Sequence, residues 1–176
     1  MSFDGEMVSE SWSFPQANRR HDAITQLGVQ FAYSDDLENP FYKVLFCLDE
    51  MGDLSEDGVE VRCHEHEVDM LMDFHHVIIQ RDPDIITGYN INKFDWPYIL
   101  KRAKSLKLPK EFFVLGRYFR EETELKVSYK SKLNKEKKVQ YDVPVVGGRR
   151  IEDCYKSVKD LQKKHPSYRL GILVER

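Results

Sequence analysis

The chain has 176 residues, 41% of them hydrophobic, so it can bury one core, and one domain is predicted. Its formal net charge of -3 excludes a general polyanion binder, so a nucleic-acid role must rest on local basic patches and on metal ions that shield carboxylates. Three widely spaced cysteines argue against a disulfide framework, and without a membrane-spanning run or a signal peptide the chain is predicted to be soluble and intracellular, with no membrane partner.

The first predicted element is a strand over residues 2–7, which carries Asp4 and Glu6. Side chains alternate along a strand, so these two carboxylates point to the same face. Like charges so close repel each other unless a cation lies between them, and Mg²⁺ and Mn²⁺ prefer such oxygen ligands. A metal-binding pair is one interpretation; taken alone, the two residues favour a solvated acidic strand end.

Two more strands are predicted after a polar loop at residues 9–20. Residues 23–33 alternate cleanly between apolar and polar side chains, and residues 41–48 form a second such run. With the first strand they predict an antiparallel meander. Trp12 and Phe14 in the polar loop could stack on a base, although packing back on the domain is the favoured interpretation.

A helix is predicted after an acidic, solvated connection at residues 49–60. One helical face would hold Val68, Leu71, Met72, His75, Ile78 and Ile79. The nearby run Cys63-His64-Glu65-His66, together with His75-His76, invites a zinc hypothesis, but its spacing fits no paired structural zinc pattern. His75 is therefore predicted to be a hydrogen-bonded histidine beside the core.

The segment from Asp82 to Leu100 holds a β-branched strand, a break at Gly88 and a helix that opens near Trp96-Pro97. Asp95 would then lie at the start of a helix and the carboxyl end of a strand, where open α/β sheets usually carry ligands. The plain alternative is that Asp95 only caps the helix. The helix positions predicted to face inward are Ile99, Leu100, Ala103 and Leu106. The basic positions predicted to face outward, near enough to help hold a phosphate backbone, are Lys101, Arg102, Lys104 and Lys107.

Two alternating runs on either side of a polar turn predict a long β-hairpin within residues 119–146. The runs are residues 125–130 and 138–143, and their lysines discourage edge aggregation.

The run Asp82-Pro83-Asp84-Ile85-Ile86-Thr87-Gly88-Tyr89-Asn90, followed by Phe94-Asp95, closely resembles the second exonuclease motif of family-B DNA polymerases. Ser2-Phe3-Asp4-Gly5-Glu6 resembles their first motif, except that Gly5 stands where an apolar residue is typical, which predicts a looser pocket behind the carboxylates. Gly147-Gly148-Arg149-Arg150-Ile151-Glu152-Asp153 resembles a Gly-Arg-x-x-x-Asp strand of this family, which implies a strand there and a helix at residues 155–164. Ser167-Tyr168-Arg169-Leu170 resembles the family's Ser-Tyr-x-Leu segment. The third motif, Tyr-x-x-x-Asp, would lie beyond Arg176.

The resemblance implies an α/β, RNase H-like exonuclease fold, with a mixed central sheet flanked by helices. It implies that residues 1–176 are an exonuclease-like domain truncated at both ends. The hairpin at residues 119–146 would be an insertion, which in the family helps part the primer end from the template. The implied partners are primer-template DNA and the remainder of a polymerase chain, in the nucleus or at a viral replication site.

The resemblance also implies a chemistry, the 3′→5′ proofreading hydrolysis of a frayed single-stranded 3′ end with two divalent cations, Mg²⁺ or Mn²⁺. Asp4 would bridge both ions, Glu6 would hold the ion beside the attacking water, and Asp95 would hold the second. Asn90 would contact the terminal nucleotide, and Phe94 would shape the floor of the site. Without the third motif, the segment is expected to cleave slowly or not at all.

Two other interpretations stay open. One is a stand-alone RNase H-like nuclease. The other is a non-catalytic exonuclease-like module that binds DNA or serves a structural role. The presence of Asp4, Glu6 and Asp95 together argues against a decayed site.

Overall fold

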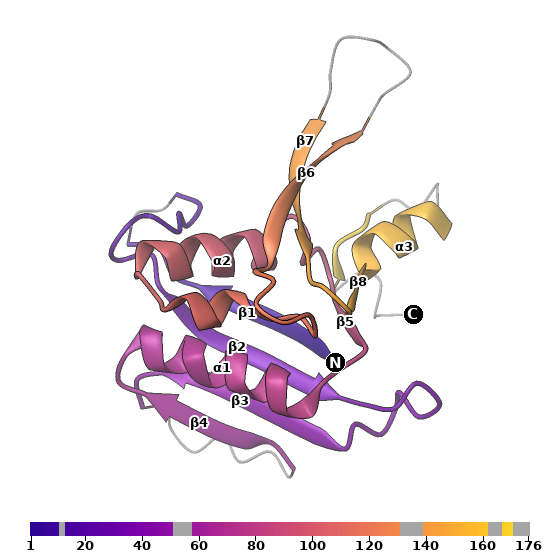
Figure 1. The fold of residues 1–176 in the computed structure, drawn as a ribbon, viewed down its shortest axis with the longest axis horizontal. Coiled ribbons are helices and arrows are strands. Elements are labelled where there is room, and N and C mark those ends of the chain that lie inside the picture. Colours follow the sequence, from indigo (N-terminus) through magenta and orange to yellow (C-terminus); the bar gives the residue numbers. More distant parts are fainter. Residues whose placement is uncertain (11–12, 51–57, 131–138, 162–166, 171–176) are drawn as a thin grey trace.

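A six-stranded mixed sheet forms the centre of the computed structural model, which describes residues 1–10, 13–50, 58–130, 139–161 and 167–170 (Figure 1). The strands are β1 (Ser2–Met7), β2 (Ile24–Phe31), β3 (Tyr42–Leu48), β4 (Glu60–His64), β5 (Ile85–Gly88), β6 (Glu124–Lys130), β7 (Val139–Val145) and β8 (Arg150–Asp153). The helices are α1 (Glu67–Arg81), α2 (Asp95–Ser105), α3 (Cys154–Leu161) and the short 3-10 helix η1 (Lys110–Phe113).

The sheet order is β4-β3-β2-β1-β5-β8, and β6 and β7 form a separate two-stranded hairpin. β1, β2 and β3 pair in antiparallel fashion, which confirms the predicted meander. β4 joins β3, β5 joins β1 and β8 joins β5 in parallel. β4 was not predicted from the sequence, because it has only five residues, none of them buried, and it directly follows the acidic connection.

Helices α1 and α2 lie over one face of the sheet (Figure 1). Phe3 of β1 connects them, since its ring centroid lies 4.9 Å from that of Trp96 in α2 and 5.8 Å from that of Phe74 in α1. The predicted apolar face of α1 is confirmed in part, since Leu71, His75 and Ile78 are buried, while Ile79 is 39% exposed. The buried face also includes three residues that were not predicted, Met70, Phe74 and Val77. The core is therefore built mainly between these two helices and strands β1 to β3.

Arg102 was predicted to face solvent, and this prediction is wrong. Its side chain is 3% exposed and pairs with Glu67 at the start of α1, with 2.7 Å between Nη2 and Oε2. Glu67 also accepts a hydrogen bond from the backbone N–H of Ile24, at 2.9 Å. A buried arginine needs a partner carboxylate, and here that partner lies far from it in sequence, where helical periodicity gives no indication of it.

The same guanidinium organises the loop before β2. Its Nη atoms donate to the backbone carbonyls of Ala17, Arg19 and Arg20. Tyr98 of α2 adds a hydrogen bond from its hydroxyl to the carbonyl of Asp22, at 2.7 Å. These polar contacts attach the loop to α2.

The hairpin β6–β7 projects away from the sheet (Figure 1) and lies within the predicted range 119–146. The predicted polar turn of this hairpin falls within residues 131–138, which lie outside the described residues. The two chain segments at its root are joined by a hydrogen bond from the N–H of Arg117 to the carbonyl of Gly147, at 2.7 Å. Gly116 permits this approach, because a Cβ at Gly116 would lie 2.5 Å from the same oxygen.

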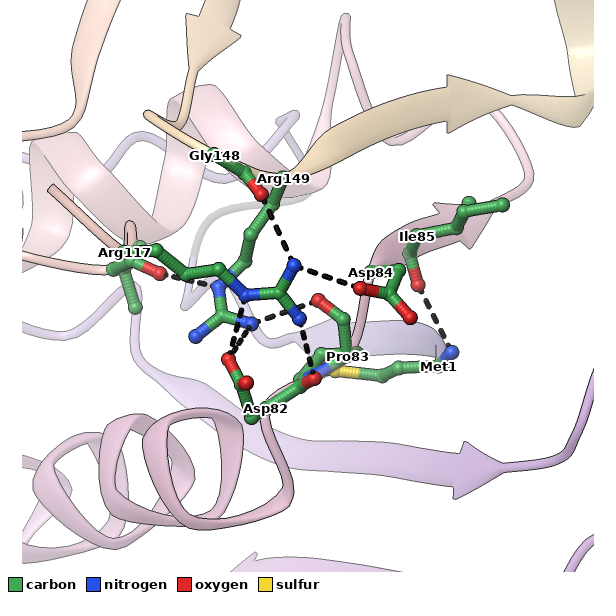
Figure 2. Close-up of polar contacts among 9 residues, drawn as sticks. Met1, Asp82, Pro83, Asp84, Ile85, Arg117, Gly148 and Arg149 are labelled. Atoms are coloured by element: carbon green, nitrogen blue, oxygen red, sulfur yellow. Dashed lines mark hydrogen bonds and ion pairs between the residues drawn. The ribbon is translucent and has the colours of Figure 1, made fainter.

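Two arginines attach this root to the end of α1 (Figure 2). Asp82, which ends α1 in a left-handed conformation, accepts hydrogen bonds at Oδ1 from Arg117 Nε at 2.9 Å and Arg149 Nη1 at 2.7 Å. Arg149 is 2% exposed and also donates to the carbonyls of Pro83 and Leu115. The hairpin root is therefore held to the turn between α1 and β5.

His75 behaves as predicted. It is 7% exposed, and its Nε2 lies 3.3 Å from the carbonyl oxygen of Val114. Within the described residues, no group of three or more His, Cys, Asp or Glu side chains is arranged to hold a metal ion. In the same residues, no helix is long and apolar enough to cross a membrane.

Replacing Glu67 with Gln tests the buried ion pair. The change leaves the Arg102 guanidinium buried without its carboxylate, so we expect the free energy of unfolding in urea to fall by about 3–5 kcal/mol. Glu60→Gln, which removes an exposed carboxylate from Arg62, is the matched control and should cost less than about 1 kcal/mol. Equal losses in the two variants would contradict this role.

A second prediction concerns pH. Burial lowers the pKa of His75, an effect that its contact with the Val114 carbonyl only partly offsets. Below about pH 6.5 the unfolded chain binds a proton that the folded chain does not, so His75 makes the protein less stable as the pH falls toward the lowered pKa. We expect His75→Phe to lose part of the decline in unfolding free energy between about pH 7.5 and about pH 5.

The neighbouring residue supplies the control for this measurement. His76 is exposed, so His76→Gln should keep most of the wild-type pH dependence. A His75→Phe profile that parallels the wild-type profile would show that His75 does not contribute to it.

Candidate active site

The centre of the sheet has a step where β5 ends before β1 does. β5 pairs with β1 only at its carboxyl-terminal half, where Thr87 lies opposite Ser2. Gly88 then lets the chain pass close to β1, because a Cβ at this position would lie 2.5 Å from the carbonyl oxygen of Phe3. Past this point, the edge of β1 faces the loop at residues 89–94 and the start of α2.

Asp95 occupies this step. It is the first residue of α2, is 2% exposed, and accepts a hydrogen bond at Oδ1 from the backbone N–H of Gly5, at 3.2 Å. The N-cap position belongs to Phe94, and no side chain makes a capping hydrogen bond there. The interpretation of Asp95 as only a helix cap is therefore wrong, because its carboxylate reaches across to β1.

The environment of Asp95 is unfavourable for a negative charge. Burial, then the nearby charge of Asp4 and more weakly that of Asp153, raise its pKa to about 7, although hydrogen bonds from backbone N–H groups act in the opposite direction. A carboxylate with these surroundings is one that a bound cation would stabilise in its ionised form.

Asp4 and Glu6 lie on either side of Gly5 and are both exposed. They point to the face of β1 opposite Phe3, as the strand alternation predicts. The structure brings Asp95 against the strand that carries Asp4 and Glu6. Within the part of the chain that the structure describes, however, Asp4, Glu6 and Asp95 are not gathered into a group that could hold a metal ion.

The predicted loose pocket behind Gly5 is not present. A Cβ built on Gly5 would lie 3.1 Å from Met7 Cε, 3.2 Å from Leu27 Cδ2 and 3.3 Å from Asp95 Oδ1. The space that a larger residue would use is filled by Met7, by Leu27 and by the Asp95 carboxylate itself. The residue type alone could not show this, because the filling atoms come from other parts of the chain.

The two predicted DNA-binding residues lie on the loop that precedes α2. Asn90 has a left-handed backbone, with φ of 64°, and its side chain is half-buried. The ring of Phe94 packs edge-on against Phe14, which is 70% exposed, with 5.1 Å between the ring centroids. Phe14 therefore packs on a site residue rather than on the core. Trp12 lies outside the described residues.

Asp153 is a further acidic residue beside the loop, and it was not among the predicted site residues. It ends β8, is 7% exposed, and accepts hydrogen bonds from backbone N–H groups of this loop. The one sequence signal for it is its place in the resembling run of residues 147–153.

The fold and the acidic residues beside β1 define a mixed α/β domain with an acidic site. Comparisons with known proteins show which family this domain belongs to. Residues 1–171 match the family described as DNA polymerase family B, exonuclease domain. The DNA polymerase delta catalytic subunit of Dictyostelium discoideum is 39% identical over 117 residues, which cover 66% of this chain and 10% of that protein. The same subunit of Drosophila melanogaster is 38% identical over 117 residues, with the same coverage.

A viral protein is also similar. The DNA polymerase catalytic subunit of Epstein-Barr virus is 35% identical over 106 residues, which cover 60% of this chain and 10% of that protein. The chain therefore belongs to the exonuclease-domain family of the family-B DNA polymerases, and its helix-flanked mixed sheet is consistent with the RNase H-like fold. The match spans about a tenth of the length of these relatives.

Proposed function

We propose that this chain is the 3′→5′ proofreading exonuclease domain of a family-B DNA-directed DNA polymerase. The observation that carries the proposal is the contact between Asp95 and the backbone of Gly5, which brings a buried carboxylate to the strand that bears Asp4 and Glu6. The substrate would be the single-stranded 3′ end of DNA, and the remainder of the polymerase chain would be the partner. The nucleus or a viral replication site would be the place of action.

Asp4, Glu6 and Asp95 all offer carboxylate oxygens, which are the ligands that Mg²⁺ and Mn²⁺ prefer, so their chemistry suits the two divalent cations of the proposed reaction. Burial, and after it the charge of Asp4, raises the pKa of Asp95, and a cation beside this carboxyl group would favour its ionised form. When bound, such cations supply an activated water and stabilise the charge on the leaving oxygen.

The reaction is a hydrolysis. Water adds to the phosphorus of the last phosphodiester, the bond from phosphorus to the 3′ oxygen breaks, and that oxygen takes up a proton. The products are a nucleoside 5′-monophosphate and a strand one nucleotide shorter. Asp4, Glu6 and Asp95 would be the catalytic residues, because they hold the cations beside the reacting phosphate.

Binding of the DNA end would depend on the loop before α2. Asn90 would contact the terminal nucleotide, while the rings of Phe94 and Phe14 would stack on bases, which suits an end of any sequence. Lys93 adds a positive charge to the same loop and is exposed, with its Nζ 5.2 Å from the centre of the Tyr155 ring. The hairpin within residues 119–146 would help separate the primer end from the template.

The first test is the digestion of a single-stranded DNA labelled at its 5′ end, with Mn²⁺ present. We expect shortening from the 3′ end that requires the metal and that Asp95→Asn abolishes, because the amide cannot replace a ligand carboxylate. Asp84→Asn, at the other end of β5 and with its side chain 84% exposed, is the matched control and should digest DNA like the unmodified chain.

The same assay can be run on a longer chain that includes a Tyr-x-x-x-Asp motif after Arg176. It tests whether the third motif is required for cleavage. Cleavage by the longer chain alone would keep Asp4, Glu6 and Asp95 as the site and show that the third motif is required. Absence of cleavage by both chains would overturn the proposal in favour of a non-catalytic module.

The aromatic pair gives a separate prediction. Removing a ring on which a base stacks costs about 1–3 kcal/mol, so we expect Phe94→Ala and Phe14→Ala each to raise the KM for single-stranded DNA by about 5- to 150-fold. Phe41→Ala is the control, since Phe41 stacks on Tyr33 in the loop between β2 and β3. If the three variants have the same KM, Phe94 and Phe14 do not stack on the DNA.

A further inference from the structure

Asp153 uses both oxygens of its carboxylate to hold backbone N–H groups. Oδ1 accepts hydrogen bonds from the N–H of Asn90 at 2.9 Å and from that of Tyr155 at 3.0 Å. Oδ2 accepts one from the N–H of Asn92, at 3.1 Å. The bond from Tyr155 caps helix α3, but the other two reach across to the loop between β5 and α2.

This loop needs such support. Asn90 adopts a left-handed backbone, which asparagine tolerates better than most residues other than glycine but which still costs free energy relative to the right-handed region. Its carbonyl then accepts hydrogen bonds from the N–H groups of Lys93 and Phe94, and the carbonyl of Ile91 accepts one from that of Trp96. The conformation that Asp153 holds is thus continuous with the first turn of α2, where Asp95 begins the helix.

We propose that Asp153 is a positioning residue, which fixes the loop at residues 89–94 through the N–H groups of Asn90 and Asn92 and thereby places Asp95 against β1. We assign it no contact with the substrate, because three backbone N–H groups already donate hydrogen bonds to its carboxylate. The consequence for DNA cleavage rests on the proposed function, whereas the consequence for the loop and for the place of Asp95 does not.

Two variants separate positioning from capping. Asp153→Asn keeps an oxygen that can accept hydrogen bonds from the N–H groups of Tyr155 and Asn90. It places an amide NH₂ opposite the N–H of Asn92, so the hydrogen bond to Asn92 is replaced by two donors that face each other. Asp153→Ala removes all three contacts. The matched control is Glu152→Gln, which removes a negative charge from the preceding residue, whose carboxylate contacts Arg150 and Ser157 instead of the loop.

The direct measurement is amide hydrogen exchange by NMR. In Asp153→Asn we expect the Asn92 N–H to exchange roughly 10- to 100-fold faster, and in Asp153→Ala those of both Asn90 and Asn92, since each loses a bond to a charged acceptor. A titration with Mn²⁺, followed by broadening of the Gly5 amide signal, should require roughly 10- to 100-fold more metal in both variants. Cleavage of single-stranded DNA should slow by a similar factor.

The outcomes are distinct. If Asp153→Asn matches Glu152→Gln in exchange at Asn92, the carboxylate only caps α3 and the inference is overturned, even if cleavage falls. Exchange at Asn92 in Asp153→Asn could instead be faster while the amount of Mn²⁺ needed matches that of Glu152→Gln. In that case Asp153 holds the loop but does not place Asp95, which also overturns the inference. Failure of the unmodified chain to bind Mn²⁺ or to cut DNA counts against the proposed function. Faster exchange at Asn92 in the Asp153 variants would still show that Asp153 stabilises the loop.

Discussion

The buried ion pair between Glu67 and Arg102 is the contact on which the arrangement of the fold depends. It joins the start of α1 to α2, and through Ile24 and the carbonyls of the preceding loop it joins both helices to β2. Charges this deeply buried tolerate little change in geometry, because each loses its compensation when the other moves. The pair therefore limits where α2 can lie over the sheet, and with it the place of Asp95 and of the loop that carries Phe14.

The site arises because neighbouring strands have different lengths. A strand that continues past its neighbour exposes a backbone N–H that must find another acceptor, and on β1 that acceptor is the carboxylate of Asp95. The contact places an acid against a strand that already carries Asp4 and Glu6. Backbone hydrogen bonding thus brings together like charges that would otherwise repel, and a cation is the natural means of balancing them.

Much of this could be predicted from the sequence, because period, glycine breaks and acidic spacing are local signals. They gave the meander, both long helices, the hairpin and the approximate place of Asp95. Three of the misses share one cause, since each depends on contacts between residues that are distant in sequence. Arg102 follows a solvent-facing pattern until Glu67 is beside it, the space behind Gly5 is filled in part by Leu27 and Asp95, and the contacts of Asp153 reach back to Asn90 and Asn92.

The closed root of the hairpin bears on how this domain can vary. Arg117 and Gly147 are joined by a backbone hydrogen bond, and the arginines beside them attach to Asp82, so the two chain ends of the arm are already held together by the domain. A longer arm adds little closure entropy, about 0.6 kcal/mol for each doubling of its length. Insertions and deletions can therefore accumulate between these two residues without disturbing the core, which makes the arm a place where related polymerases can diverge in length while they keep the same acidic edge.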